Sequence, residues 1–587
     1  MLEKWFVQAK RADFDKMGEV FSIDPVIARI IRNREVITEE DIKYYLNGTL
    51  CDLHSPWLMK DMDKAVKIIK DKIKGQKKIR VIGDYDIDGV NATYILLKGL
   101  ERCGAQVDTD IPDRMKDGYG INESLIDDAF EAGIDTIITC DNGIAAVAQT
   151  AYARQLNMTV IITDHHDIPF EEKDGMKKEI YPMANAIVNP KQSNCSYPFK
   201  QICGAVVAYK IVQALYEEFN IPEEECHQWI EFAAMATVGD VMDLVGENRI
   251  IVREGLRRMK STKNKGLASL ITLNGLTDGN LSSYHIGFVI GPCINAGGRL
   301  DTAKRALELL NCDSIEEAGK LAGDLKNLND SRKSLTLKGL ETALELIEAS
   351  ELKKDKVLIV YLPKCHESLA GIIAGRIREN YNKPAIVFTD CEGGAKGSGR
   401  SIEAYNMFEE LSKCKDLFTK FGGHPMAAGL SLPKENIDIL RLRLNKETVL
   451  TEEDFIAKIM IDVPMPIHYI TEKLIRDLEI LEPFGKANEK PLFAEKNLCI
   501  LSARILGKNQ NVLKLKIQNN TGCTMDALYF GNIGKFQEFL SGKYGEEELK
   551  AMYAGRENKI QLSITYYPTI NEYNGCRTLQ VIIKNYC

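Results

Sequence analysis

The chain comprises 587 residues, of which 45% are hydrophobic and 27% charged, and it carries a formal net charge of −8. This composition is typical of a globular protein and excludes a low-complexity chain, while the length predicts roughly three or four domains. The negative balance does not exclude a nucleic-acid partner, because phosphate binding depends on local basic groups.

The chain shows no pattern of export or membrane insertion. Its first residues, MLEKWFVQAKRADF, mix charged and apolar side chains, unlike a signal peptide, and no apolar run approaches the roughly 18 residues of a membrane span. Fifteen cysteines are scattered without CxxC pairs, which argues against a disulfide framework or a zinc module. Free thiols in such a chain predict the reducing cytoplasm as its location.

The first half of the chain is expected to form a helical lead-in and then an α/β domain. Residues 1–75 indicate short helices and loops, ending in the amphipathic helix DMDKAVKIIKDKIKG. Over residues 76–260, the apolar runs KKIRVIGDYD, AQVDTDIP, IDTIITCDNG and NMTVIITDHH alternate with helical patterns. Such alternation predicts a mostly parallel sheet with helices on both faces.

The second half is expected to contain three further regions. Residues 261–350 are helical and end in a long connector helix over about 313–350. A smaller α/β domain covers 351–450, beginning at DKVLIVYLP. Over 451–587 the strand patterns follow one another closely, which predicts an OB-like β-barrel domain.

Acidic and histidine side chains gather where the strands of the first α/β domain end. In such sheets, ligands bind outside the carboxyl ends of the strands. Three strands end in such residues, and a further acid follows a small-residue helix; the residues are Asp84, Asp86, Asp88, Asp141, Asp164, His165, His166 and Asp240. An isolated aspartate after a strand is usually a turn or helix-cap residue, but this coincidence favours a metal site.

The spacing limits which of these groups can share an ion. Residues two apart on a strand face the same way about 6.8 Å apart, which suits two ions roughly 3.5–4 Å apart better than one. His165 and His166 point to opposite faces of an extended chain, so at most one is expected as a direct ligand. Carboxylate-rich ligation with one imidazole favours Mn²⁺ or Mg²⁺. Asp88, before Gly89 and a predicted helix, is equally compatible with a helix cap.

The segments DYDIDG, CDNG, TDHH and VGDVMDL resemble the four motifs of the DHH phosphoesterase superfamily. More narrowly, GYGIN, YPFKQICGAVVAYK, GPCINAGGRLDTA, KGSGRS, FGGHPMAAGL and LEPFGKANEKPLF resemble the RecJ family of single-strand-specific 5′→3′ exonucleases. The ordered series runs from about residue 75 to the C-terminus. The resemblance implies a DHH catalytic domain, a DHHA1 substrate-binding domain and an OB-fold nucleic-acid-binding domain.

The resemblance also implies roles for individual residues. It places a two-metal centre on Asp84, Asp86, Asp141, His165 and Asp240, with Asp88 and His166 as further ligands or supporting groups and Asp164 as an orienting group. The implied substrate-binding residues are Arg114, Arg299, His366, Ser398, Gly399, Arg400, Ser401, Gly422, Gly423 and His424. In the barrel, Lys508, Lys514 and Lys516 are candidate phosphate contacts, and Tyr529, Phe530 and Tyr573 are candidate stacking platforms or core residues.

The implied activity is a metal-dependent exonuclease that removes nucleoside 5′-monophosphates from the 5′ ends of single-stranded DNA, in DNA repair and recombination. Two divalent cations, Mn²⁺ or Mg²⁺, are the implied cofactors. The implied partners are single-stranded DNA, a single-strand-binding protein and a helicase, with a monomeric chain and no membrane contact. Two alternatives remain open from the sequence: a DHH phosphodiesterase for short oligonucleotides or cyclic dinucleotides, and a single-strand-binding relative without catalysis.

Overall fold

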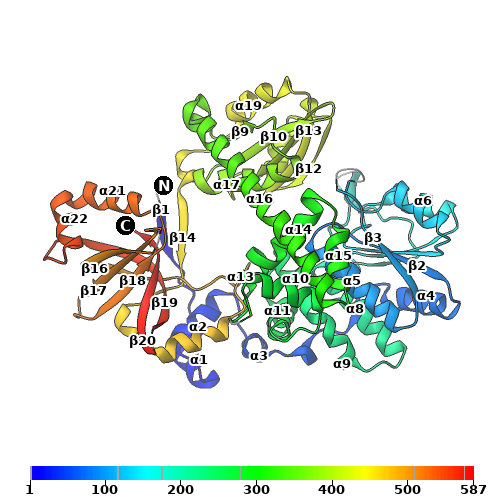
Figure 1. Ribbon diagram of the computed structural model, residues 1–587, viewed down its shortest axis with the longest axis horizontal. Helices are drawn as coiled ribbons and strands as arrows, with labels where there is room; N and C mark the ends of the chain where they lie inside the picture. Colours follow the sequence, from blue (N-terminus) through cyan, green and yellow to red (C-terminus); the bar gives the residue numbers. More distant parts are fainter. Residues whose placement is uncertain (1–2, 115–117, 174–175, 278, 508, 574) are drawn as a thin grey trace. The chain divides into compact units, whose positions relative to one another are not determined.

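The computed structural model describes residues 3–587 apart from 115–117, 174–175, 278, 508 and 574 (Figure 1). Within this part of the chain, the residues divide into two compact units. One unit comprises Thr49–Ala457, and the other combines Glu3–Gly48 with Lys458–Cys587. Each unit is described by itself below.

The first unit contains the parallel sheet that the alternating pattern predicted. Its five strands lie in the order β3-β2-β4-β5-β8, and all neighbours are parallel. The strands are β2 (Lys78–Ile82), β3 (Gln106–Asp110), β4 (Thr136–Cys140), β5 (Thr159–Thr163) and β8 (Ala186–Val188). Because β4 and β5 are buried on both faces, their sequences are almost continuous apolar runs.

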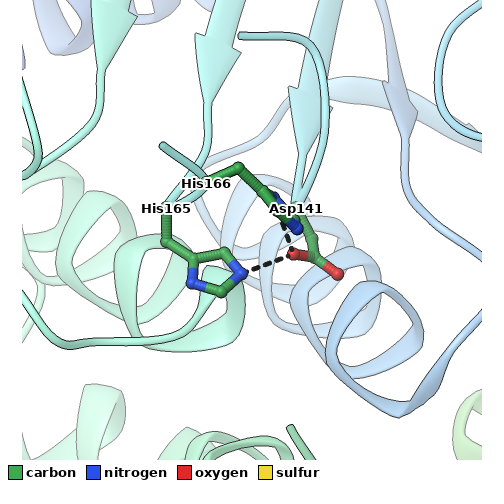
Figure 2. A group of neighbouring side chains, drawn as sticks. All are labelled: Asp141, His165 and His166. Carbon is green, nitrogen blue, oxygen red and sulfur yellow. Dashed lines mark ion pairs between the residues drawn. The ribbon is translucent and has the colours of Figure 1, made fainter. Parts of the chain in front are cut away.

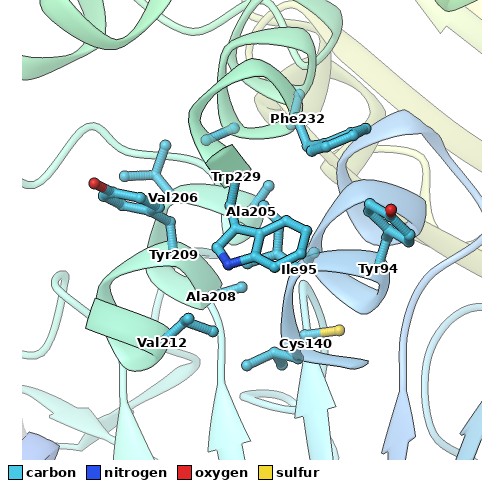
Figure 3. Close-up of a cluster of buried hydrophobic side chains, with 14 of the residues drawn as sticks. Tyr94, Ile95, Cys140, Ala205, Val206, Ala208, Tyr209, Val212, Trp229 and Phe232 are labelled. Carbon is cyan, nitrogen blue, oxygen red and sulfur yellow. The ribbon is translucent and has the colours of Figure 1, made fainter. Parts of the chain in front are cut away.

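Helices cover both faces of this sheet. One core combines strand residues such as Ile138 with α4 (Met62–Lys74), α5 (Ile87–Arg102), α8 (Gly204–Glu218) and α10 (Ile230–Gly239). Figure 3 shows part of this core, where the rings of Tyr94 and Phe232 lie 4.7 Å apart. The opposite face packs Ile137 against α6 (Glu123–Glu131) and α7 (Val147–Gln155).

A helical region follows the sheet and ends in the predicted connector. Its helices include α11 (Gly246–Met259), α12 (Lys265–Leu273), α14 (Gly291–Leu300), α15 (Lys304–Asn311) and α16 (Ile315–Ala349). The side chain of Ser314 caps the start of α16. Ala318 and Leu325 pack on the first core, whereas Ala343 and Ile347 belong to the core of the second sheet, so α16 connects the two α/β parts.

The second sheet has the order β12-β13-β11-β10-β9, with β9 and β10 parallel and the other neighbours antiparallel. Its strands are β9 (Leu358–Tyr361), β10 (Ala385–Cys391), β11 (Gly394–Arg400), β12 (Lys420–His424) and β13 (Ala427–Leu432). Helix α17 (Glu367–Tyr381) packs against β10 and β11, and α19 (Asn436–Glu447) belongs to the core of the other face.

The second unit contains the predicted OB-like barrel. Strand β16 pairs with both β17 and β19, so five strands form a closed ring of pairings. These are β16 (Phe493–Leu506), β17 (Val512–Gln518), β18 (Thr524–Tyr529), β19 (Gln561–Tyr573) and β20 (Cys576–Tyr586). Two helices that the sequence patterns did not indicate, α21 (Ile533–Tyr544) and α22 (Glu546–Tyr553), follow β18.

The N-terminal helices belong to this second unit. Helices α1 (Phe14–Phe21), α2 (Pro25–Asn33) and α3 (Glu39–Asn47) share a core with the barrel strands. Arg34 forms a buried ion pair with Asp462, and the Tyr45 hydroxyl donates to Asn488. Strand β1 (Glu3–Val7) pairs with β14 (Ala457–Ile461), whereas short helices and loops had been expected there. The strand depends on a partner far along the chain, which local patterns do not reveal.

Candidate metal centre and substrate surface

The predicted ligands converge at the carboxyl edge of the first sheet. Asp84 follows β2, Asp141 follows β4, and His165 follows β5, while Asp240 caps the C-terminal end of α10. Figure 2 shows the carboxylate of Asp141 between the rings of His165 and His166. Because the strands are parallel and in register, segments distant in sequence reach one site.

His165 lies at the centre of the cluster. Its Nε2 atom is 3.0 Å from Asp141 Oδ1, 3.5 Å from Asp88 Oδ2 and 3.8 Å from Asp240 Oδ2. Three overlapping triads have ligand atoms within 4.8 Å of one another: Asp141, His165 and His166; Asp88, His165 and Asp240; and Asp84, Asp86 and Asp141. Overlapping triads suit two neighbouring cations better than one.

Two buried carboxylate oxygens at this edge lack a hydrogen-bond donor. Asp84 Oδ1 and Asp141 Oδ1 are buried and accept no hydrogen bond from the described residues. Buried polar atoms are normally satisfied, so such orphaned carboxylate oxygens have the chemistry to bind a cation. The residues present therefore suit the divalent, oxygen-preferring ions that the sequence predicts.

Electrostatics supports the same conclusion. Burial and then repulsion from Asp86 raise the pKa of Asp84 well above its ordinary value, and burial and Asp88 do the same for Asp141. Burial and Asp88 raise the pKa of Asp240 to about 8. Burial lowers the pKa of His165, which favours the neutral imidazole that ligates metals. Without a compensating positive charge, these carboxyl groups resist ionising together.

The backbone is unusual at two positions of the site. Asp141 and Val241 both have positive φ, 60° and 56°, which is unusual for any residue and most of all for a β-branched one. Such strain is concentrated at functional sites. Gly204, at the start of α8, lies so close to Asp141 that a Cβ there would be 2.7 Å from Asp141 Cβ. Helix α8 therefore supports this ligand directly.

The structure corrects the geometry expected for the first acidic segment. Strand β2 ends at Ile82 and α5 begins at Ile87, so Asp84, Asp86 and Asp88 do not lie along one extended strand. The cap of α5 is Asp86, whose Oδ1 accepts the N–H groups of Asp88 and Gly89. The cap role considered for Asp88 in that helix is wrong.

Asp88 instead contacts the beginning of α8. Its two carboxylate oxygens accept the N–H groups of Gly204 and Ala205, each at 2.7 Å. Both oxygens are thus occupied by the positive end of a helix, an arrangement that stabilises the carboxylate. Asp88 remains within reach of His165, but its geometry favours a supporting position.

The expectation for the two histidines also changes. Because β5 ends at Thr163, the chain is not extended at His165 and His166, and their ring centroids lie only 4.5 Å apart. Both rings reach Asp141. Asp164 accepts hydrogen bonds from the N–H groups of Ile144, His165 and His166, and it pairs with His166 Nδ1 at 2.8 Å. Its hydrogen bonds agree with an orienting role.

His166 differs electrostatically from His165. Burial acts to lower the pKa of His166, but its hydrogen bond with Asp164 and the surrounding carboxylates raise it to about 9. Burial likewise opposes the ionisation of Asp164, but the pairing with His166 lowers the pKa of Asp164 to about 2. The two residues form a charged pair beside the metal ligands.

Residues without ligating groups complete the site. Tyr119 donates its hydroxyl to the carbonyl oxygen of Asp141 and stacks edge-on against Tyr85. Asn295, on α14, accepts the N–H of Ile87 at 2.8 Å and so holds the start of α5. Tyr119 and Asn295 lie in the segments GYGIN and GPCINAGGRLDTA, but no local signal assigns their side chains to the centre.

Two predicted substrate residues lie next to the centre. The guanidinium of Arg114 lies 5.1 Å from the ring centroid of Tyr85. Arg299 donates to the carbonyl oxygen of Ser368, on α17, at 3.0 Å. Neither arginine has a carboxylate partner among the described residues, so both are available to an anion.

The glycine-rich segments lie on the second sheet rather than in turns. Ser398 and Arg400 share one face of β11, where Arg400 also donates to Ser398 Oγ. Gly399 faces the other way, against Met407, and Ser401 is buried with its hydroxyl donating to Tyr405. The structure thus gives Gly399 and Ser401 packing roles, because alternate residues of a strand face opposite sides.

The hairpin of β12 and β13 adds to the same face. Gly429 pairs with both Ser398 and Gly422, and a Cβ at either glycine would meet no atom within 4 Å. Gly423 packs closely on Ala428, and His424 lies exposed at the end of β12. At the start of α17, His366 caps the helix and pairs with Ser368 Oγ at 2.7 Å.

In the described part of the barrel, only some of the lysine and aromatic side chains predicted to contact a nucleic acid are free to do so. Lys514 and Lys516 both pair with Asp526, and Tyr529 packs against Phe536 and Tyr586. Phe530 is exposed. Lys508 and the side chain of Tyr573 lie outside the described part of the chain. Among the described helices, none combines the length and hydropathy of a membrane span.

Known proteins resemble the chain over its whole length. Family models match at residues 78–237 (DHH family, N-terminal domain), 354–448 (DHHA1 domain) and 461–585 (RecJ OB domain). The single-stranded-DNA-specific exonuclease RecJ of Bacillus subtilis is 37% identical over 589 residues, covering 99% of this chain and 70% of the relative. The Escherichia coli protein of the same name is 30% identical, covering 99% of each chain.

A solved structure shares the fold. The crystal structure of RecJ in complex with Mn²⁺ from Thermus thermophilus matches with a TM-score of 0.82 and 25% identity, covering 100% of this chain and 79% of that one. A second structure from the same organism, in complex with Mg²⁺, matches with a TM-score of 0.76.

Proposed function

We infer the function from one premise: the chain belongs to the RecJ family of single-stranded-DNA-specific exonucleases. It is a metal-dependent exodeoxyribonuclease that hydrolyses single-stranded DNA from the 5′ end and releases nucleoside 5′-monophosphates, in DNA repair and recombination. The observation that carries this function to the present chain is the complete acidic and histidine cluster around Asp141 and His165. A relative without catalysis would have no need of it.

The alternative of a small-substrate phosphodiesterase is less well supported. Such an enzyme needs the first two domains alone, whereas the family match here extends through the OB domain at 461–585. OB folds bind extended single strands, so this part of the chain favours a long substrate.

We propose that Asp84, Asp86, Asp141, His165 and Asp240 hold two divalent cations, Mn²⁺ or Mg²⁺. The orphaned oxygens of Asp84 and Asp141 and the neutral imidazole of His165 support this set. When bound, such ions polarise a phosphoryl group and generate a nucleophile from water near neutral pH. Asp88 holds the beginning of α8 in place, and through it the position of Asp141.

The charged residues of the chain itself then orient the substrate. His166, held by Asp164, presents a protonated imidazole beside the metal ligands, where it can donate to a phosphate oxygen. Arg114, lying against Tyr85, supplies a second donor near the same acids. These groups fix the scissile phosphodiester and balance the charge that develops on its oxygens.

Strand polarity is proposed to come from the second sheet. Ser398 and Arg400 would bind the 5′ phosphate, with Arg299 and His366 beside them and Gly422 and His424 along the path of the backbone. Small side chains on this face leave room for a phosphodiester chain, as the empty space beside Gly422 indicates. Gly399, Gly423 and Ser401 maintain the packing that presents this surface.

Several further assignments follow from the family. We propose a monomer with a helical lead-in at 1–75 and domains at 76–260, 261–350, 351–450 and 451–587, acting in the cytoplasm, which suits its free cysteines. A helicase that exposes single strands and a protein that coats them are the proposed partners. The barrel would guide the strand, with Phe530 as an exposed stacking candidate.

One experiment tests the function. Long oligonucleotides labelled at either end, as single strands and as duplexes, are incubated with Mn²⁺ or Mg²⁺. Single strands should release labelled mononucleotide early from the 5′ label and late from the 3′ label, and duplexes should resist. The Asp141→Asn variant should bind the strand but not cleave it. Release that starts at the 3′ end, or equal cleavage of duplex, contradicts the proposal.

A further inference from the structure

Arg332, on the connector helix α16, is a positively charged group that neither the sequence motifs nor the proposed site includes. Its side chain is half-buried, and within the described chain no carboxylate forms an ion pair with it. Its neighbours along the helix behave differently, because Lys326 and Lys333 both pair with Asp330. An unpaired guanidinium that gives up part of its hydration requires an explanation.

The orientation of Arg332 is fixed from within the protein. Asn329, one turn earlier and almost fully buried, accepts hydrogen bonds from both Nε and Nη2 of Arg332, at 3.1 and 2.9 Å. The amide of Asn329 in turn donates to the sulfur of Cys293, on α14. These contacts fix the orientation of the Arg332 guanidinium. Both N–H groups of Nη1 and one of Nη2 remain available to donate to a ligand. Such preorganisation reduces the entropy lost when a ligand binds.

Arg332 belongs to a group of arginines, with Arg114 and Arg299, none of which forms an ion pair with a carboxylate of the described residues. Burial, followed by the charges of Arg114 and Arg332, lowers the pKa of Arg299 to about 10. Burial also lowers the pKa of Arg332, with a contribution from Arg376. Like charges gathered in this way are unfavourable alone and favourable around an anion. Since Arg299 reaches Ser368 on α17, the cluster lies where the two α/β parts meet.

We propose that Arg332 binds a phosphate of the DNA strand other than the one being cleaved. This inference rests on the proposed function and adds a residue to its substrate surface. Arg332 is linked through Asn329 to Cys293 on α14, the helix that also carries Arg299. In the described part of the chain, no hydrogen bond or ion pair links Arg332 to a proposed metal ligand, since its side chain is held by Asn329 alone. A planar, bidentate guanidinium suits a phosphate oxygen pair.

The test compares Arg332→Gln, Arg332→Lys and the wild type in binding a labelled single strand in EDTA, which prevents cleavage. Arg332→Gln should weaken binding roughly tenfold at low salt, and the slope of log affinity against log salt should fall by about 0.7, the value of one contact on a single strand. Arg332→Lys should recover the salt dependence but only part of the affinity. Lysine keeps the positive charge but lacks the paired N–H donors of the planar guanidinium. With Mn²⁺, KM should rise while kcat changes by less than about twofold.

Arg376→Gln is the matched control. Arg376 lies near Arg332 but is exposed and paired with Glu379 at 3.0 Å, so its removal should leave the salt slope unchanged. Asn329→Asp tests the positioning: it keeps the contact but supplies a carboxylate that neutralises Arg332, and it should weaken binding as Arg332→Gln does. If the contact between Asn329 and Arg332 serves only the fold, the Asn329→Asp variant should bind the single strand as the wild type does.

Oligonucleotides with a 5′ phosphate or a 5′ hydroxyl distinguish the source of the phosphate. A loss confined to the phosphorylated strand identifies the terminal phosphate, and an equal loss on both identifies an internal one; either supports the contact. Wild-type affinity and slope in Arg332→Gln, or equal effects of Arg332→Gln and Arg376→Gln, overturn it. Failure of the wild type to release mononucleotides refutes the proposed function instead, independently of these binding results.

Discussion

Replacing Gly204 by alanine should disable the metal centre without removing any ligand. Gly204 is the first residue of α8, and its N–H donates to Asp88 at 2.7 Å. An added Cβ would lie 2.7 Å from Asp141 Cβ and 3.0 Å from Asp141 Oδ1. Ordinary carbon contacts are about 3.5–4.0 Å, so the helix and the ligand must separate by roughly 1 Å.

A displacement of that size is large for an active site. Misplacing a catalytic group by about 1 Å can cost roughly 100-fold in rate, and overpacking a core costs about 1–3 kcal/mol of stability. We therefore expect Gly204→Ala to lower kcat about 100-fold while the protein remains folded. Single-strand affinity should change little, because the proposed substrate residues on the second sheet are not touched.

The assay measures mononucleotide release from a 5′-labelled strand over a range of Mn²⁺ concentrations, with a melting curve for each protein. Gly319→Ala is the control, because a Cβ at Gly319, on α16, meets no atom within 4 Å. That variant should keep full activity and gain up to about 1 kcal/mol of stability from helix propensity. A Gly204→Ala protein with kcat within twofold of the wild type would refute the idea that α8 positions Asp141.

Three further predictions concern metal, pH and the second unit. Removing divalent ions with EDTA should abolish cleavage, and Mn²⁺ but not Zn²⁺ should restore it, as expected for carboxylate-rich ligation; activity in EDTA would contradict the metal centre. Burial raises the pKa of Glu231 from 4.5 to about 7, so the folded protein favours the protonated carboxyl group. Because the unfolded chain ionises at the lower pH, about 3 kcal/mol of the free energy of unfolding should be lost as the pH rises from 4.5 to above 7. Glu231→Gln should reduce this loss in melting curves at pH 5 and pH 8, whereas the exposed Glu224→Gln should not; equal pH dependence in both variants would contradict the assignment. Arg34→Ala should destabilise the second unit by about 3–5 kcal/mol in urea unfolding, because it leaves Asp462 buried and unpaired; a loss below 1 kcal/mol would show that water reaches the pair.

Much of the architecture followed from local patterns. Apolar runs of strand length separated by helical periodicity are sufficient to indicate a parallel sheet, and parallel strands bring their carboxyl ends to one edge. For this reason Asp84, Asp141 and His165 could be assembled into one site from the sequence. The connector helix was equally accessible, because a long helix-forming stretch over about 313–350 is a local signal, and the structure adds that Ser314 caps its start.

The individual roles of the acids in this site could not be predicted from local patterns. Asp86 and Asp88 look alike in DYDIDG, but one caps its own helix and the other accepts N–H groups from α8, more than a hundred residues later. The same limit applies to Gly399, whose orientation depends on strand register, and to the N-terminal helices, whose core is completed by the barrel.

The sequence by itself determined the kind of chemistry, because acids and a histidine at neighbouring strand ends leave few alternatives to a pair of divalent cations. Tertiary structure decided which of these side chains meet, which of them hold neighbouring groups in place, and that Arg332 stands without an ion pair among the described residues. The physical reason is that a ligand's role depends on the donors and charges around it, and most of those come from distant parts of the chain.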